Sequence, residues 1–267
     1  MIVFLLKVLR FFWSLPVCLL GLAGCSQPPI VTPPPTPIPL TVALTPAARP
    51  FGKILRVCAA SQPLLAFFLE EAPAQGMDLN RYDLVFRLGL PAESEAFSAP
   101  LGWENIVVYT NEPAVTQLKK SDLRGLFSGK ITIWKGADGL DHPVQVWTFP
   151  AGDEARQVFD EAIMAGERLT PKAYLAPDPQ AMLEALSSQA GSVGILPAAW
   201  VKSSKPAGSF PIHEVSLDAG AKSVLRLPIL ALAKAEPQGA ARSLISCLQS
   251  KDGQAMISSL YETWDNK

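Results

Sequence analysis

SDLRGLFSGKITIW, residues 121–134, is the most specific local pattern in this chain. Ser121 is predicted to cap a short helix, whose apolar face is formed at i, i+3 and i+4 spacing by Leu123, Leu126 and Phe127. Ser128 and Gly129 should end that helix, because glycine readily takes the left-handed conformation of a C-terminal cap. The β-branched residues that follow favour an extended segment as far as Trp134. By itself this pattern predicts a helix–turn–strand corner and no chemistry.

The first 25 residues have the layout of a lipoprotein signal. A short basic region is followed by an apolar stretch from Phe11 to Leu22 and then by Leu-Ala-Gly-Cys, which resembles a lipoprotein cleavage box. We therefore predict a signal peptide over residues 1–24 and a mature N-terminus at Cys25 that carries lipid. Such a chain is anchored to a membrane without crossing it. The alternative is an uncleaved anchor helix that starts at Ile2, and it also places the remainder outside the cytoplasm.

Residues 25–50 are rich in proline and thin in charge. Proline cannot donate a hydrogen bond to a sheet and favours extended polyproline geometry, so this segment is predicted to be a semi-rigid tether. The folded part is expected to begin near Phe51. That leaves about 215 residues, which is enough for a two-lobed domain with a real core.

Charge and cysteine content exclude several classes of protein. Without residues 1–24 the chain has 21 basic and 24 acidic residues, and it has no basic stripe with interleaved aromatic residues, so we expect no nucleic-acid partner. Cys58 and Cys247 remain after cleavage and lipidation, and they either pair in an oxidising compartment or stay buried as free thiols. His142 and His213 stand alone, so no zinc site, other metal site, cofactor or histidine-based catalytic triad is expected.

Predicted strands and helices alternate along the remainder. The strands are expected at 54–59, 82–86, 105–109, 144–147, 192–196 and 227–232, and the helices at 63–71, 153–165, 178–188 and 239–261. Strands separated by helices favour a mostly parallel sheet with covered faces, which is the α/β class.

The chain resembles the PstS-like, phosphate-type periplasmic binding proteins. Residues 121–134 are similar to the family signature L-x-x-I-F-x-G-K-I-T-x-W, and three further family segments are matched in order at 105–111, 191–197 and 250–257. The resemblance implies a two-lobed type II α/β fold with mostly parallel sheets and a double-crossover hinge. One lobe would comprise 51–109 plus 200–267 and the other 110–199, with the ligand between them. The strands around Ile106 and Val193 would then run side by side as the two hinge crossings.

Two departures from the family pattern concern the ligand. The span between Ala72 and Tyr82 is too short for the extra strand and helix that the family inserts there. The family's anion motif, Arg-x-Asp-Gly-Ser-Gly-Thr, corresponds here to residues 149–155, where phenylalanine, alanine, aspartate and alanine replace the arginine, the acceptor aspartate and the two hydroxyl residues. Asp153 should cap the following helix and occupy its free amides, and Glu154 adds a second negative charge. Phosphate binding is therefore predicted to be weak or absent.

Five residues form the predicted ligand-binding set. By resemblance, Ser61 matches the family's first-loop hydroxyl and Asp83 its strand-end aspartate, although Asp83 is equally natural as a turn former. Asp153 and Glu154 come from the altered motif, where Asp153 alternatively serves only as a helix cap. Arg156, like Arg87, offers positive charge at a new position, or else it pairs with an acid on its own helix.

The resemblance implies a non-enzymatic function on the cell envelope. We predict a membrane-tethered, extracytoplasmic component of an ABC importer that binds a small solute other than simple phosphate and presents it to a permease. The alternative is a PstS-like sensor or interaction module that serves no transporter. An enzyme with Asp153 and Glu154 as an acid/base pair is not expected, because adjacent helix residues point in different directions.

Overall fold

The computed structural model describes residues 36–267 apart from 76, 91–96, 136–140, 205–207 and 265–267. The predicted signal peptide, Cys25 and residues 26–35 of the predicted tether lie outside the described residues. The chain divides into Met1–Thr36 and one compact unit, Pro37–Lys267, and the description below concerns the second unit. None of the described helices is long and apolar enough to cross a membrane.

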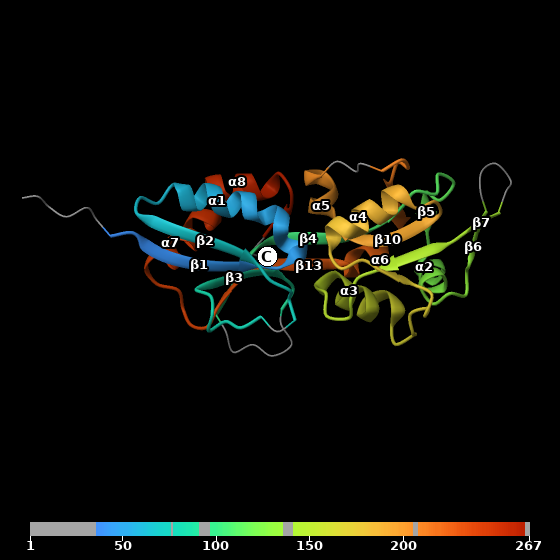
Figure 1. Cartoon of the computed structure of the whole chain (residues 1–267), viewed down its shortest axis with the longest axis horizontal. Coiled ribbons are helices and arrows are strands. Elements are labelled where there is room, and N and C mark those ends of the chain that lie inside the picture. The colour runs from blue at the N-terminus through green and yellow to red at the C-terminus, as the bar shows by residue number, and fades with distance from the viewer. Residues whose placement is uncertain (1–35, 76, 91–96, 136–140, 205–207, 265–267) are drawn as a thin grey trace, which may run out of the picture. The chain divides into compact units, whose positions relative to one another are not determined.

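The first lobe is built from both ends of the compact unit (Figure 1). The N-terminal part contributes β1 (Ile38–Leu44), the 3-10 helix η1 (Pro46–Phe51), α1 (Gly52–Ala60), β2 (Leu65–Glu71), β3 (Leu84–Leu88) and the first half of β4 (Phe97–Thr110). The C-terminal part contributes β13 (Arg226–Ala233), α7 (Gly239–Gln249), α8 (Lys251–Ser258) and β14 (Glu262–Thr263).

The second lobe is formed by the middle of the chain together with the second half of β4. Its elements are β5 (Gln117–Leu118), α2 (Lys120–Phe127), β6 (Ile133–Lys135), β7 (Asp141–Pro143), β8 (Gln145–Thr148), α3 (Glu154–Phe159), the π-helical turn η2 (Asp160–Met164), β9 (Tyr174–Leu175), α4 (Pro179–Ser188), β10 (Ser192–Pro197), α5 (Ala198–Ser203), β11 (His213–Glu214), β12 (Ser216–Leu217) and α6 (Ala219–Val224).

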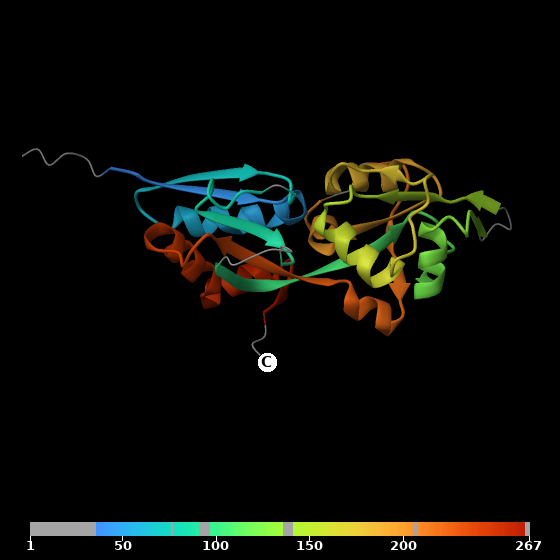
Figure 2. The ribbon, with the colours of Figure 1, turned by 90° about the horizontal axis from the view of Figure 1, so that it is seen from below.

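Strand β4 is shared by the two lobes. The main sheet has the order β2-β1-β3-β13-β4-β10-β8-β9, with β1 parallel to β2 and β3, and β8 parallel to β9 and β10. Up to Asn105, β4 pairs with β13, whereas from Ile106 to Thr110 it pairs with β10. Figure 2 shows β4 and β13 running together from one lobe toward the other. The molecule is thus a two-lobed α/β protein with a double crossover, as the sequence predicted.

The structure confirms the prediction that the strands around Ile106 and Val193 run side by side, since β4 and β10 are paired. In β10, Val193 lies opposite Thr110 and Pro197 lies opposite Ile106. The prediction that these two strands are the hinge crossings is only half right, because β10 stays within the second lobe. The return crossing is the entry into β13, where the Ile106 amide donates a hydrogen bond to the carbonyl of Leu225 (2.8 Å).

The structure corrects the N-terminal third of the sequence prediction. Residues 54–59 lie in helix α1 instead of a strand, and most of 63–71 lies in strand β2 instead of a helix. The strand that opens the fold is β1, inside the predicted tether, and it pairs with β2 on one side and β3 on the other. Because Leu40 and Val42 are buried core residues, the folded part begins near Ile38 and not near Phe51.

The predicted lobe boundary also shifts. Residues 213–224 were expected in the first lobe, but β11 pairs with β4 at Tyr109 and Thr110, and β12 pairs with β5. These short strands attach residues 213–217 to the second lobe. We therefore place 37–105 and 226–264 in the first lobe and 106–224 in the second.

The signature at 121–134 has a packing role. Its apolar face is buried as predicted, and Phe127 packs on Phe159 with ring centroids 4.5 Å apart. Gly129 follows the helix in the left-handed region (φ +79°), also as predicted. The helix starts earlier than expected, however, since Lys119 is its N-cap and Ser121 lies inside it. The segment fixes α2 against the α3 side of the second lobe.

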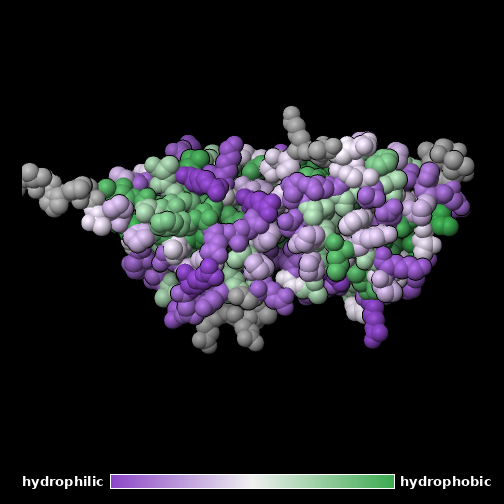
Figure 3. Space-filling view, viewed as in Figure 1, coloured by the Kyte–Doolittle hydropathy of each residue, from purple (hydrophilic) through white to green (hydrophobic). Residues whose placement is uncertain are grey.

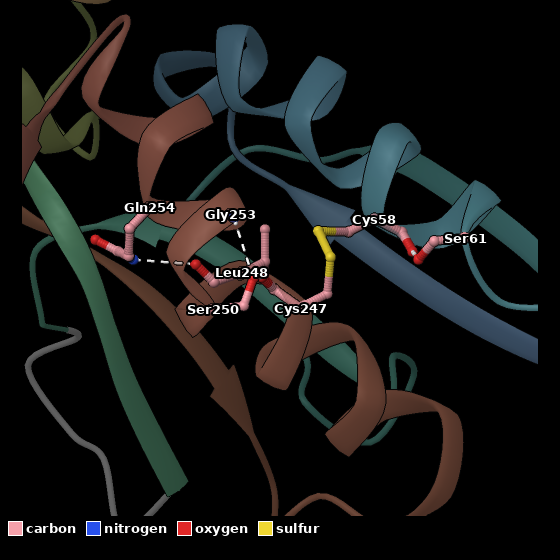
Figure 4. Close-up of a disulfide and its surroundings, with 7 residues drawn as sticks. All are labelled: Cys58, Ser61, Cys247, Leu248, Ser250, Gly253 and Gln254. Atoms are coloured by element: carbon pink, nitrogen blue, oxygen red, sulfur yellow. Dashed lines mark hydrogen bonds between the residues drawn. A yellow bond between two sulfur atoms is a disulfide. The ribbon is translucent and has the colours of Figure 1, made fainter.

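A disulfide joins Cys58 of α1 to Cys247 of α7 (Figure 4). This resolves the choice that the sequence left open between pairing and free thiols. The two cysteines are 189 positions apart in the chain, so the bond links the N-terminal and C-terminal parts of the first lobe.

Candidate functional site

Three elements converge where the two lobes meet. The carboxyl ends of β1 and β3 come from the first lobe, and the N-terminus of α3 comes from the second. A cavity of about 100 Å³ lies there, lined from both lobes by Pro46, Pro73, Ala74, Gln75, Pro150, Gly152, Asp153, Glu154 and Pro177. Small-molecule sites usually have about 300–1,000 Å³, so this cleft is nearly filled by the protein itself.

Glu154 crosses from the second lobe to the first. Its Oε1 accepts a hydrogen bond from the backbone amide of Leu88 (3.0 Å) and lies 3.5 Å from the guanidinium Nε of Arg87. The Thr45 hydroxyl is close enough to lower the pKa of Glu154, although Thr45 Oγ1 lacks a hydrogen bond of full geometry among the described residues. Glu154 is 3% exposed and Arg87 is 8% exposed, so the ion pair is buried.

Asp153 turns back onto its own helix. It is the N-cap of α3, and its Oδ1 accepts a hydrogen bond from the backbone amide of Arg156 (3.1 Å). Its carboxylate therefore occupies an amide that a bound anion would otherwise use, as the sequence predicted. Adjacent residues thus point in different directions, one into its own helix and one across the cleft.

Arg156 makes its contacts within the second lobe. Its Nε binds Asp160 Oδ2 at 2.6 Å, one helical turn further on, and its Nη1 donates to the Thr148 hydroxyl (3.0 Å) and to the Phe149 carbonyl (3.1 Å). The alternative that Arg156 pairs with an acid on its own helix is confirmed. Arg87, which sequence reasoning considered only in passing, is the arginine that meets α3.

Two members of the predicted set lie away from the cleft. Ser61 follows the last turn of α1, beside the disulfide, and its hydroxyl donates to the Cys58 carbonyl at 2.7 Å (Figure 4). Asp83 lies directly before β3, at the end opposite Leu88, and accepts hydrogen bonds from the amide and hydroxyl of Thr41 (2.7 and 2.8 Å). The placement of Ser61 follows from the exchange described above, because residues 54–59 were taken as the first strand. Asp83 lies away from the cleft because it precedes β3 instead of following it.

Thr45 and Leu88 were missed by sequence reasoning. Thr45 follows β1 directly and is the N-cap of η1, which is the position expected of a first-loop hydroxyl once β1 is recognised. The sequence signal was a threonine between an apolar run and Pro46. Leu88 acts through its backbone amide, so no side-chain pattern could have found it.

Burial raises the pKa of both Asp153 and Glu154. Loss of solvent raises the pKa of Glu154 to about 8, although nearby Arg87 opposes the shift. Loss of solvent also raises the pKa of Asp153 to about 6, against the hydrogen bonds from the helix amides. The site is therefore one in which holding negative charge is costly, and a further anion would add to that cost.

A third buried carboxyl lies at the crossing itself. Glu104 is 1% exposed, and its Oε1 accepts hydrogen bonds from the amides of Asn105 (3.0 Å) and Ala199 (3.3 Å). Burial raises its pKa to about 8. Because β4 changes partner directly after Asn105, we assign Glu104 a structural role in joining β4 to the start of α5.

A wider hollow lies elsewhere, on the surface between the first lobe and helix α5 of the second lobe. It has about 660 Å³ and a basic rim formed by Arg49, Lys53, Arg56 and Lys202. Arg49 already pairs with Glu71 and lies over the Trp200 ring, at 4.8 Å from its centroid. The face shown in Figure 3 mixes hydrophilic and apolar residues. Size alone does not make this hollow a ligand site.

Among the described residues there is no cluster of histidine, cysteine and acidic side chains that could hold a metal ion.

Comparison with known proteins supports the same architecture. Residues 144–259 match a family model described as bacterial extracellular solute-binding protein. A protein from Clostridium perfringens assigned as a phosphate ABC transporter substrate-binding protein, solved with bound phosphate, superposes with a TM-score of 0.71 at 16% identity, covering 85% of this chain and 100% of that one. An ABC-type phosphate transport receptor from Vibrio cholerae gives 0.62 at 17% identity, covering 84% and 100%.

A regulatory protein shares the fold as well. The regulatory domain of OxyR from Pseudomonas aeruginosa, in its reduced form, superposes with a TM-score of 0.56 at 15% identity, covering 82% of this chain and 98% of that domain. At such identities the likeness establishes a common fold. Function has to be argued from the site.

Proposed function

We propose that this chain, whose fold is that of the two-lobed, PstS-like periplasmic binding proteins, is a lipid-anchored solute-binding protein of the cell envelope. It would work with an ABC permease and take a small solute other than simple phosphate. The observation that supports this most directly is the position of Asp153 and Glu154, whose carboxylates occupy donors on both sides of the cleft. No catalytic step is part of the proposal.

Rejection of phosphate follows from charge. A buried oxyanion needs charge-assisted donors to replace its water. Here the α3 amide binds Asp153, Arg87 binds Glu154, and Arg156 binds Asp160. At neutral pH Asp153 is above its pKa of about 6 and carries a negative charge. A phosphate about 4 Å from it would be repelled by about 1 kcal/mol even at the dielectric of water, and by more in a closed cleft.

Isothermal titration with phosphate at neutral pH tests this part of the proposal. The phosphate transport receptor from Vibrio cholerae is a suitable positive control. We expect no measurable heat of binding for this chain. A dissociation constant of about 1 μM or tighter, which is about −8 kcal/mol, would mean that the cleft recruits donors other than those described. A thermal-shift screen of small solutes would then identify the ligand, because binding selective for the folded state raises the unfolding midpoint.

The lipid anchor is a separate part of the proposal, since Cys25 lies outside the described residues. Replacing Cys25 with serine should move the protein from the membrane fraction to the soluble fraction. A Cys18→Ser variant is the matched control, because Cys18 lies within the predicted signal and should not affect anchoring. Continued membrane retention of Cys25→Ser would favour the uncleaved anchor.

A second candidate function is a sensor or interaction module that serves no transporter. The observation that favours it is the small volume of the cleft, about 100 Å³. A permease gene and an ATPase gene beside the coding gene would support the transport function. A neighbouring kinase or adhesion gene, together with a negative solute screen, would support the second candidate.

A further inference from the structure

The donors around Glu154 form a site that is larger than one ion pair. Thr45 directly follows β1, and Leu88 is the last residue of β3, which is parallel to β1 and adjacent to it. Arg87 precedes Leu88 on β3. Together they present a hydroxyl, a backbone amide and a guanidinium. All three come from the first lobe, and the group that they surround comes from the second. We call these three donors the cradle.

The cradle is buried and has one charged partner. Thr45 is fully buried, and Arg87 is more than nine-tenths buried. Among the described residues, Glu154 is the only acid found in an ion pair with Arg87. A guanidinium in such surroundings is costly without an anion beside it, so the cradle requires a negatively charged occupant. A carboxylate satisfies this need, because it accepts hydrogen bonds on two oxygens.

We infer that Thr45, Arg87 and the Leu88 amide form a carboxylate-binding site, and that Glu154 fills it as an internal ligand that keeps the two lobes together without a solute. A solute bound between lobes normally provides such a link from outside the chain. Here the link is part of the chain. This inference concerns the contact alone, so it does not depend on export, lipid anchoring or a transporter.

The neighbouring cavity makes the site accessible to small probes. Glu154 lines the cavity of about 100 Å³ between the lobes, together with Gln75 of the first lobe and Gly152 of the second. Removing the Glu154 side chain would extend that cavity to the cradle. Propionate has the size of the side chain lost in Glu154→Gly, and acetate has the size of the side chain end lost in Glu154→Ala.

Chemical rescue of the full-length protein tests the inference. The measurement is the thermal unfolding midpoint at about pH 9, where the probes and Glu154 are ionised, at constant ionic strength with chloride as the reference anion. Glu154→Gly is expected to lower the midpoint by about 10 °C, because it leaves the buried Arg87 guanidinium without an anion beside it. Propionate at millimolar concentration should recover at least half of that loss. Acetate should act best on Glu154→Ala.

Three controls separate a specific site from a general salt effect. Glu161→Ala removes an exposed acid from the same segment and should neither shift the midpoint nor respond to propionate. Asp178→Asn keeps the cap of α4 but weakens a second ion pair between the lobes, Arg49–Asp178 (3.7 Å), which is partly exposed, and it should cost little. Adding Arg87→Met to Glu154→Gly should abolish the rescue.

Several outcomes would overturn the inference. An unchanged midpoint in Glu154→Gly would show that the cradle does not need its occupant. Equal stabilisation of the wild type by propionate, or rescue by phosphate and sulfate as strong as by propionate, would exclude a carboxylate site. If Glu154→Gly does not fold, Glu154→Ala with acetate replaces it. Failure of acetate to raise the Glu154→Ala midpoint would then contradict the inference.

Discussion

Two links between distant parts of the chain differ in kind. The Cys58–Cys247 disulfide is covalent and lies within the first lobe, between α1 and α7. The Arg87–Glu154 contact is ionic and joins the first lobe to the second. The ion pair can therefore open under native conditions, whereas the disulfide cannot. The disulfide permanently ties together the two chain segments of the first lobe, whereas the ion pair across the cleft can break and re-form.

Removing the disulfide should give the largest effect. A Cys58→Ala, Cys247→Ala variant is expected to lose about 3–5 kcal/mol of unfolding free energy, because the bond closes a very long loop in the unfolded chain. Denaturant unfolding of the oxidised and reduced wild type and of the variant measures this. A loss below about 1 kcal/mol would mean that the bond contributes little beyond packing, and the contrast between the two links would fail.

Replacing Arg87 with methionine should rank second. It leaves the Glu154 carboxyl buried without its cation, and we expect a loss of about 3 kcal/mol at about pH 9. The loss should shrink at low pH, where Glu154 takes up a proton. Arg81→Met is the matched control, because Arg81 pairs with Glu70 on an exposed surface and should cost at most about 1 kcal/mol. Equal losses in the two variants would show that burial does not distinguish them.

The pH dependence of stability follows from Glu154 and Glu104. Both have a pKa of about 8 in the folded state against 4.5 for an ordinary glutamate, because burial disfavours their charged forms. The folded state then holds more protons than the unfolded state between these values. The contribution of each to stability is fully present below about pH 4.5 and is lost as the pH rises to about 8.

We therefore expect the unfolding midpoint to fall as the pH rises from 5 to 9. Glu104→Gln and Glu154→Gln should each flatten the profile, whereas the exposed Glu161→Gln should leave it unchanged. A midpoint that rises over this range would show that Arg87 holds Glu154 ionised throughout. The cleft would then resist opening at every pH in the range.

Loss of the α3 cap should give the smallest effect. Asp153→Ala removes the hydrogen bond to the Arg156 amide and is expected to cost about 1 kcal/mol. Asp153→Asn keeps a capping oxygen and should cost a few tenths of that. If Asp153→Ala instead produces phosphate binding by titration, Asp153 is the residue that excludes the anion, and the role assigned to Glu154 shrinks accordingly.

The sequence predicted the second lobe better than the first. The apolar spacing of Leu123, Leu126 and Phe127 and the capping role of Asp153 were both correct, because local chemistry determines them. The exchange of strand and helix over residues 54–71 came from apolar runs that suit either structure, and tertiary pairing decides between them. The strand β1 was missed because nearby prolines suggested a tether.

The candidate site was predictable only in part, for a related reason. Asp153 and Glu154 were found from the altered motif, but the direction of Glu154 depends on β3, which is 66 positions away from it at Leu88. No local pattern reports a contact of that kind. Ser61 lies away from the cleft because residues 54–59 form a helix and not the first strand, and Asp83 lies away from it because it is at the start of β3.

The position of β13 has a consequence for biosynthesis. This strand, residues 226–233, inserts between β3 and β4, which precede it by more than a hundred residues. During synthesis from the N-terminus, the sheet of the first lobe lacks β13 until the last part of the chain has been made. Nearly all of the second lobe has been synthesised by then and can fold. Truncation before β13 should therefore leave an aggregation-prone intermediate with exposed strand edges.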